Sequence, residues 1–137
     1  MKRKSESKLQ SDCFVYFNNN FSLKHHNPRL IMQLVPNESA SSMAGVLKGM
    51  GVPDRVLQKA VALVTQGMKL MGLKAGASDT IIIAPNRVVF VEFKLPNGTH
   101  QANQLEYKQQ VEELGHEYVT IRSVDQFKDF CETFNTK

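Results

Sequence analysis

The apolar residues of this chain gather in short runs that predict strands. Residues 80–84 and 87–94 are rich in Ile and Val and are joined by Pro85-Asn86, a pair that favours a tight turn, so they predict a β-hairpin. Two further runs predict strands: residues 30–35, expected to be a buried strand, and residues 117–121.

Apolar positions three or four residues apart predict the helices. A first amphipathic helix is expected over residues 5–18, where a run of three asparagines ends it. The segment 39–72 has the same spacing, and its internal glycines and Pro53 divide it into two helices. Two more helices are predicted over 99–114 and 123–134. These elements indicate an α/β domain in which helices flank a mixed sheet.

Length and composition fit one soluble domain spanning residues 1–137. Hydrophobic residues make up 42% of the chain, and no apolar run approaches the roughly 18 residues that a membrane span needs. The basic start is followed by no apolar core, so a secretory signal is not expected and we predict an intracellular protein. Cys13 and Cys131 lack the spacing of a zinc site and are expected to be reduced, structural thiols.

The four histidines are not predicted to bind metal. His25 and His26 lie in a loop without a third ligand at suitable spacing, and His100 and His116 lie at helix ends. We expect them to be solvated or to contact phosphate.

Charge is distributed unevenly along the chain. Residues 1–74 carry eleven Lys and Arg against four Asp and Glu, whereas residues 75–137 carry six against nine. Charge alone is better explained by solvated helix faces, although a basic half also suits a polyanionic partner. The residues that would contact nucleic acid are Lys48, Arg55, Lys59, Lys69 and Lys74. The basic helical segment at about 41–71, which contains the first four of them, could instead form an oligomer contact, and its Met and Leu residues are expected to be core.

The candidate chemistry lies on the predicted hairpin. Strand alternation places Glu92 and Lys94 on one face, and the hairpin folds Asp79 back beside Glu92. Two carboxylates, with the backbone carbonyl of Phe93 between them, are the hard oxygen ligands that Mg²⁺ or Mn²⁺ prefers. Lys94 would orient or help to deprotonate a water and steady a phosphate. Gln104 follows on the next helix.

Each of these residues also has a simpler explanation when it is taken alone. Glu92 and Lys94 could be a solvent-facing pair on an edge strand, Asp79 a turn cap, and Gln104 a surface residue of a helix. Only their combination favours an active site.

The separated motifs together resemble the VRR-NUC family, the virus-type replication-repair nucleases of the PD-(D/E)xK superfamily, and in particular its short stand-alone phage and bacterial members. The resemblance extends from Glu6 to about Phe130. It rests on these segments: Glu6-Ser-Lys-Leu-Gln10, Val35-Pro36-Asn37-Glu38, Met71 to Asp79, Val91-Glu92-Phe93-Lys94, Gly98, Gln101 with Gln104, and Leu114-Gly115. Ser78 departs from the family, which usually has proline before the aspartate.

The resemblance implies a restriction-endonuclease-like fold and a metal-dependent DNA endonuclease. It implies that Asp79, Glu92 and Lys94 form the catalytic core, that Glu6 is a further acid at the metal, and that Gln104 completes the site. A glutamate in the first turn of a helix also interacts favourably with the helix dipole, so Glu6 has a second explanation. The family further implies a homodimer that acts on branched DNA such as four-way junctions.

Three other functions stay open at this point. A nuclease of the same fold could act on duplex, flap or single-stranded DNA. A non-catalytic nucleic-acid-binding module could keep the fold without binding Mg²⁺ or Mn²⁺. A structural partner protein could use the helical segment to dimerise, but it would leave Asp79, Glu92 and Lys94 without a role.

Asn37 and Glu38 could approach the site, although an exposed turn explains them better.

Overall fold

A computed structural model describes residues 5–23, 25–36 and 39–135 of the chain. Its elements, in order, are α1 (Glu6–Phe17), the π-helix η1 (Asn18–Ser22), β1 (Ile31–Leu34), α2 (Ser39–Gly49), α3 (Asp54–Leu70), β2 (Thr80–Ala84), β3 (Arg87–Phe93), α4 (Ala102–Glu113), β4 (Glu117–Ile121), α5 (Val124–Cys131) and the 3-10 helix η2 (Glu132–Phe134). Asn37 and Glu38 lie outside the described residues.

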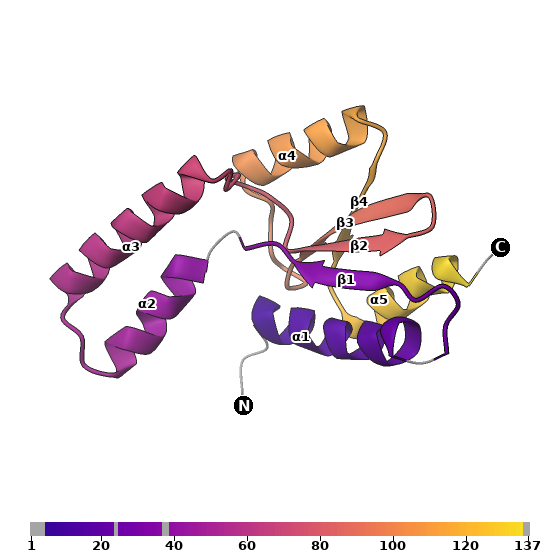
Figure 1. Cartoon of the computed structure of the whole chain (residues 1–137), viewed down its shortest axis with the longest axis horizontal. Coiled ribbons are helices and arrows are strands. Elements are labelled where there is room, and N and C mark those ends of the chain that lie inside the picture. Colours follow the sequence, from indigo (N-terminus) through magenta and orange to yellow (C-terminus); the bar gives the residue numbers. More distant parts are fainter. Residues whose placement is uncertain (1–4, 24, 37–38, 136–137) are drawn as a thin grey trace.

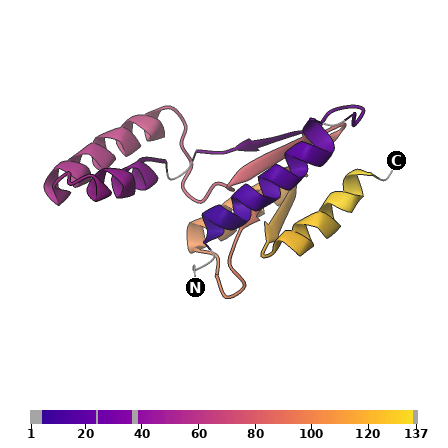
Figure 2. The same ribbon diagram turned by 90° about the horizontal axis from the view of Figure 1, so that it is seen from below.

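Four strands form one mixed sheet in the order β1-β2-β3-β4. β2 and β3 are the predicted antiparallel hairpin, and β4 runs parallel to β3 after the crossover through α4. Helices α1 and α5 cover one face of this sheet and α4 covers the other (Figures 1 and 2). β1 lies at one end of the strand order, so it is an edge strand. The expectation of a buried strand is wrong. Of its four residues only Met32 is buried, because one side of this strand has no neighbour in the sheet.

The main core lies between the sheet and the layer of α1 and α5. Its large members are aromatic: the ring of Phe127 packs 6.4 Å from Phe17 and 6.2 Å from Phe93, measured between centroids. Cys13 and Cys131 are free thiols buried in the same cluster, as expected, and burial raises the pKa of each to about 12.

The α-helix α1 ends at Phe17, directly before the three asparagines, but the chain does not leave the helical path there as the sequence analysis expects. The chain continues as η1, which carries Phe21 into the core, where it stacks on Phe17 at 5.1 Å. His26 packs beside Phe21, and its Nδ1 lies 2.7 Å from the carbonyl oxygen of Pro28, so this ring is not freely solvated. The helical propensity of asparagine is low, but burial of Phe21 stabilises the extra turn.

Helices α2 and α3 form a hairpin that stands to one side of the sheet (Figure 1). The predicted break is confirmed: Pro53 precedes α3, and Gly72, at φ +103°, closes it with hydrogen bonds from its own N–H to Lys69 and from Leu73 N–H to Met68. No helix of the described residues is long and apolar enough to cross a membrane.

The prediction that the apolar residues of this hairpin are core is wrong for most of them. Leu57 is buried, but Met43, Leu63 and Met71 are 60%, 61% and 82% exposed. Helical spacing indicates that a helix has an apolar face, but it does not indicate whether the same chain covers that face.

Candidate active site

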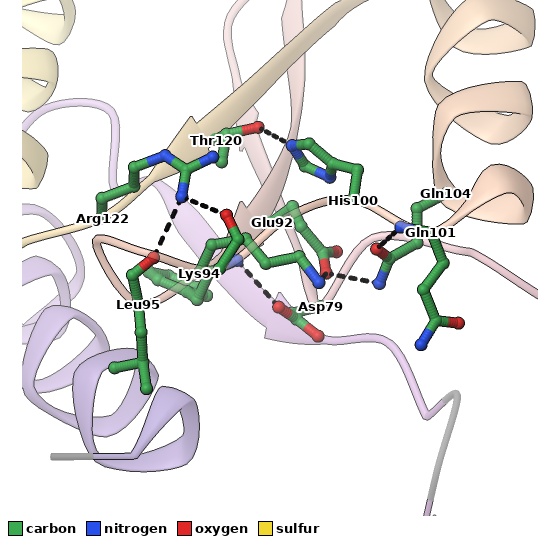
Figure 3. A network of polar contacts seen from close by, with 11 residues as sticks. Asp79, Glu92, Lys94, Leu95, His100, Gln101, Gln104, Thr120 and Arg122 are labelled. Atoms are coloured by element: carbon green, nitrogen blue, oxygen red, sulfur yellow. Dashed lines mark hydrogen bonds and ion pairs between the residues drawn. The ribbon is translucent and has the colours of Figure 1, made fainter.

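Asp79 immediately precedes β2, and the hairpin brings it back to β3. The register pairs Thr80 with Val91, so Asp79 lies opposite Glu92 at the end of the ladder. The backbone N–H of Phe93 donates a 2.8 Å hydrogen bond to Asp79 Oδ2 (Figure 3). Because the N–H and C=O of one strand residue point to the same side, the carbonyl of Phe93 also faces β2. The fold thus directs a carboxylate and a peptide carbonyl toward each other.

Glu92 and Lys94 lie on the sheet face opposite to Phe93, and both are buried. Glu92 is 2% exposed and Lys94 6% exposed. Lys94 Nζ lies 3.9 Å from Glu92 Oε1. β3 is a central strand, so the alternative of a solvent-facing pair on an edge strand is excluded. Charged residues are almost never buried to this degree unless they are paired. Glu92 and Lys94 are therefore not surface residues whose charges only keep the protein soluble.

The environment of Glu92 favours its neutral form. Burial, followed by the negative charge of Asp79, raises the pKa of Glu92 to about 8, and Glu6 adds a smaller contribution in the same direction. Lys94 acts in the opposite direction. Oε2 of Glu92 is buried and has no hydrogen-bond partner among the described residues. The ionised form of such a carboxyl group would be stabilised by a cation at this oxygen.

This raised pKa predicts an unusual pH dependence of stability in EDTA. The folded protein holds a proton on Glu92 up to about pH 8, whereas the unfolded chain releases it near 4.5. The free energy of unfolding should therefore fall as pH rises through this window. Glu92→Gln removes that loss, so at pH 8 the variant should be more stable than the wild type by a few kcal/mol, with little difference at pH 4. Urea denaturation at both pH values measures this.

The matched control for this experiment is Glu106→Gln, which neutralises an exposed carboxyl group on α4. Its denaturation curves should follow those of the wild type at both pH values. Equal stability of Glu92→Gln and wild type at pH 8 would contradict the burial of an acid at this position.

Gln104 joins the start of α4 to β3. Its Oε1 accepts a 2.9 Å hydrogen bond from the backbone N–H of Gln101, as part of a capping box. Its Nε2 donates a 3.1 Å bond to Glu92 Oε1. Because the oxygen is engaged by the cap, the amide can turn only its NH₂ group toward Glu92 (Figure 3). Gln104 is thus not a free surface residue, and its role in catalysis stays a prediction.

A second set of residues, which the sequence analysis missed, fixes the loop that follows Lys94. One guanidinium nitrogen of Arg122 donates to the carbonyls of Leu95, at 3.0 Å, and Gly98, at 2.7 Å. His100 Nε2 lies 3.0 Å from the hydroxyl oxygen of Thr120. Burial, and next the charge of Lys94, lower the pKa of His100, so this ring is not freely solvated, while the alternative of a phosphate contact stays a prediction. One sequence signal could have found these residues. Thr120 pairs with Glu92 across the sheet, and Arg122 is two residues further along the chain, so alternation places both side chains on the same face as Glu92.

The residues present suit a hard divalent cation. Among the described residues, no group of three His, Cys, Asp or Glu side chains lies close enough to hold a metal ion. The donors that meet here are instead the carboxylates of Asp79 and Glu92 and the carbonyl of Phe93, and Mg²⁺ commonly binds one or two carboxylates while it keeps several waters. Glu6 lies in the first turn of α1, exposed, and it raises the pKa of Glu92 without completing a three-acid group.

The predicted nucleic-acid contacts lie on the α2–α3 hairpin and on the segment that follows it. All five of these basic side chains are exposed: Lys48, Arg55, Lys59, Lys69 and Lys74. Lys48 Nζ lies 3.6 Å from Asp54 Oδ1, so part of its charge is offset at the tip of the hairpin. Their contact with DNA stays a prediction.

The comparisons with known proteins support the fold. No protein-family model matches the sequence, and no curated protein matches it. Among solved structures, the chain is similar to a protein described as "VRR_NUC domain protein", with a TM-score of 0.62 and 19% sequence identity over 98% of this chain and 90% of that one. This likeness confirms the predicted restriction-endonuclease-like α/β fold, while membership in the family stays a prediction.

Proposed function

We propose that this chain is a divalent-metal-dependent DNA endonuclease that hydrolyses phosphodiester bonds. The observation that carries the proposal is a buried glutamate, Glu92, which has an unpartnered oxygen and lies opposite Asp79 with the Lys94 ammonium 3.9 Å away. An arrangement of this kind costs folding free energy, because buried charged groups lose their hydration. Buried ionisable groups with strongly shifted pKa values cluster at functional sites, and a bound cation would offset the lost hydration of these carboxylates.

The cofactor in this proposal is Mg²⁺ or Mn²⁺. Asp79, Glu92 and the carbonyl of Phe93 would hold the ion, which when bound lowers the pKa of water and offsets charge on a phosphoryl oxygen. Lys94 donates hydrogen bonds to a water or to the scissile phosphate, and its fixed ammonium stabilises negative charge that develops there. Gln104 holds the carboxylate of Glu92 through Oε1, which leaves Oε2 free for the cation.

The substrate we propose is branched DNA, with the four-way junction as the first candidate. Support comes from the motif resemblance and from the fold shared with the VRR_NUC domain protein. The experiment is cleavage of a labelled four-way junction beside linear duplex, flap and single-stranded DNA, each in Mg²⁺, Mn²⁺ and EDTA. Metal-dependent cutting of the junction in preference to the others supports the proposal. Equal cutting of the other forms would keep the nuclease and reject the junction preference.

A non-catalytic nucleic-acid-binding module is the alternative from another class. It would bind the same DNA forms in EDTA and in Mg²⁺ alike and cut none of them. The fit of Asp79 and Glu92 to a cation favours the nuclease. In a module that only binds DNA, two acidic side chains next to a phosphate would repel it and weaken binding.

We further propose that two copies associate through the outer face of α3. Val56, Ala60, Leu63, Gly67 and Leu70 follow a spacing of four and three residues, which places them on one side of the helix. Val56, Leu63 and Leu70 are 48%, 61% and 86% exposed. A contiguous apolar stripe of this kind marks an interaction surface, and a symmetric dimer buries the stripe against itself. Two active sites related by a two-fold axis would suit paired incisions in a junction.

Leu63→Glu should disrupt this dimer, because it places two charges in the centre of the apolar contact. The wild type should sediment with the mass of two 15.4 kDa chains and the variant with the mass of one. Gln58→Glu adds the same charge to an exposed position on the opposite side of the same helix and should remain dimeric. A monomeric wild type at micromolar concentration, or a dimeric Leu63→Glu protein, would rule out this interface.

A further inference from the structure

The ion pair with Glu92 does not by itself fix the ammonium of Lys94. β3 ends at Phe93, and the backbone N–H of Lys94 donates one more hydrogen bond, of 3.0 Å, to the carbonyl of Ile121. Lys94 Nζ lies 3.9 Å from Glu92 Oε1, which is longer than a hydrogen bond. A lysine side chain is long and flexible, so its surroundings decide which conformation it keeps.

A tight turn over residues 95–98 packs against the base of this side chain. The backbone N–H of Gly98 donates a 2.8 Å hydrogen bond to the carbonyl of Leu95, which closes the turn. A Cβ atom at Gly98 would lie 3.6 Å from the Cβ atom of Lys94, so the turn lies directly against the lysine. The position of the turn therefore restricts where the side chain of Lys94 can lie.

Arg122 binds this turn at both ends. Its Nη1 donates hydrogen bonds to the carbonyls of Leu95, at 3.0 Å, and Gly98, at 2.7 Å. Figure 3 shows the guanidinium beside the turn, with Lys94 extending from the same segment toward Glu92. None of the ion pairs found among the described residues involves Arg122. The charge of Arg122 thus strengthens its bonds to the turn and does not balance an acidic side chain.

The strand register places Arg122 next to Lys94. β3 and β4 are parallel and pair Phe93 with Ile121, so Lys94 and Arg122 follow as the next residues on the two strands. The backbone N–H of Arg122 donates a 2.7 Å hydrogen bond to Oε1 of Gln126, on α5. Arg122 therefore connects the turn beside Lys94 to a helix that covers the main core.

We propose that Arg122 is a positioning residue, which holds the turn 95–98 so that the ammonium of Lys94 stays beside Glu92. Arg122 does not touch the reacting atoms and acts through Lys94. The inference rests on the proposed nuclease function, in which Lys94 stabilises charge at the scissile phosphate. Loss of Arg122 therefore lowers the rate of cleavage and not the affinity for DNA.

Arg122→Met tests this, because it removes both hydrogen bonds and keeps an unbranched side chain. Single-turnover cleavage should fall by about one to two orders of magnitude, the loss expected for a misplaced catalytic group. DNA binding in EDTA should keep its affinity and its dependence on salt concentration. In a Lys94→Met protein, adding Arg122→Met should slow cleavage no further, because no ammonium is left to misplace.

The matched control is Arg87→Met. Arg87 also bonds across to β4, where it pairs with Glu117 at the other end of the same two strands. This variant should lose stability but cut at the wild-type rate. Arg122→Lys is a milder second variant, because one charged nitrogen can still donate to both carbonyls. It should cut at a rate between those of Arg122→Met and the wild type.

The proposal is overturned if Arg122→Met cuts like the wild type, if Arg122→Lys cuts no faster than Arg122→Met, or if Arg122→Met slows cleavage by the same factor with and without Lys94. Weaker DNA binding with a reduced dependence on salt would also overturn it, because Arg122 would then contact a phosphate itself.

Amide hydrogen exchange separates this inference from the nuclease function, since it needs no DNA. In Arg122→Met the backbone N–H groups of Lys94 and Gly98 should exchange at least tenfold faster than in the wild type, whereas Arg87→Met should leave them unchanged. Faster exchange in a protein whose wild type cuts no DNA would reject the nuclease and keep the anchored turn. Unchanged exchange would reject the positioning role of Arg122.

Discussion

Lys94→Ala should reduce DNA cleavage by about two to four orders of magnitude while leaving DNA binding largely intact. The reduction is the size expected when a positioned proton donor or charge stabiliser is removed. Binding should survive because most contacts between a protein and DNA are made to other phosphates, by other side chains. Single-turnover cleavage in Mg²⁺ and equilibrium binding in EDTA measure the two effects separately.

Lys94→Met serves as the second variant, because it keeps an unbranched side chain of similar length in this buried position. Both variants should remain folded, since the raised pKa of Glu92 allows that carboxyl group to become neutral once its partner is gone. Loss of binding together with cleavage, or a large drop in melting temperature for both variants, would show that Lys94 is a structural residue.

Gly76→Ala should destabilise the protein by about 2 to 4 kcal/mol and should also impair cleavage. Gly76 has φ +79°, a conformation that alanine adopts only with strain. A Cβ atom there would collide with the backbone carbonyl of Asn103 and lie 2.8 Å from the backbone nitrogen of Gln104. The first turn of α4 would have to move, and Gln104 would move away from Glu92 with it.

Gly72→Ala separates the two causes, because Gly72 also has a positive φ, +103°, but a Cβ atom there would meet nothing within 4 Å. It should cost only the backbone strain, about 1 kcal/mol, and leave cleavage near the wild-type rate. Urea denaturation of the two variants gives the comparison. Equal losses of stability would show that the packing of Gly76 against α4 is unimportant.

The hairpin and its acidic pair could be predicted from the sequence because both depend on local rules. Runs rich in Ile and Val indicated β2 and β3, and the turn between them determined that Asp79 would face Glu92. Whether Glu92 and Lys94 pointed into the protein could not be decided in this way. That depends on β4 and α4, which make β3 a central strand and cover its face, and these contacts are remote in sequence.

The missed features share one physical cause, which is that they depend on the presence or absence of tertiary neighbours and not on a local pattern. Burial of Phe21 continued a helix through asparagines, and the position of β1 at the edge of the sheet exposed an apolar strand. The contact of Arg122 with the turn at Leu95 and Gly98 joins two segments that no spacing rule connects. Glu6 lies near enough to influence Glu92, but its role at a metal stays a prediction.

The most direct test of the central claim is a calorimetric titration of Mn²⁺ into the protein without DNA, repeated with Asp79→Asn and Glu92→Gln. If these two carboxylates form a cation site, the wild type should bind Mn²⁺ saturably, and either substitution should weaken that binding at least tenfold. Glu106→Gln should bind like the wild type. Mn²⁺ binding that is absent from the wild type, or that is unchanged by both substitutions, would contradict a metal-dependent nuclease site at Asp79 and Glu92.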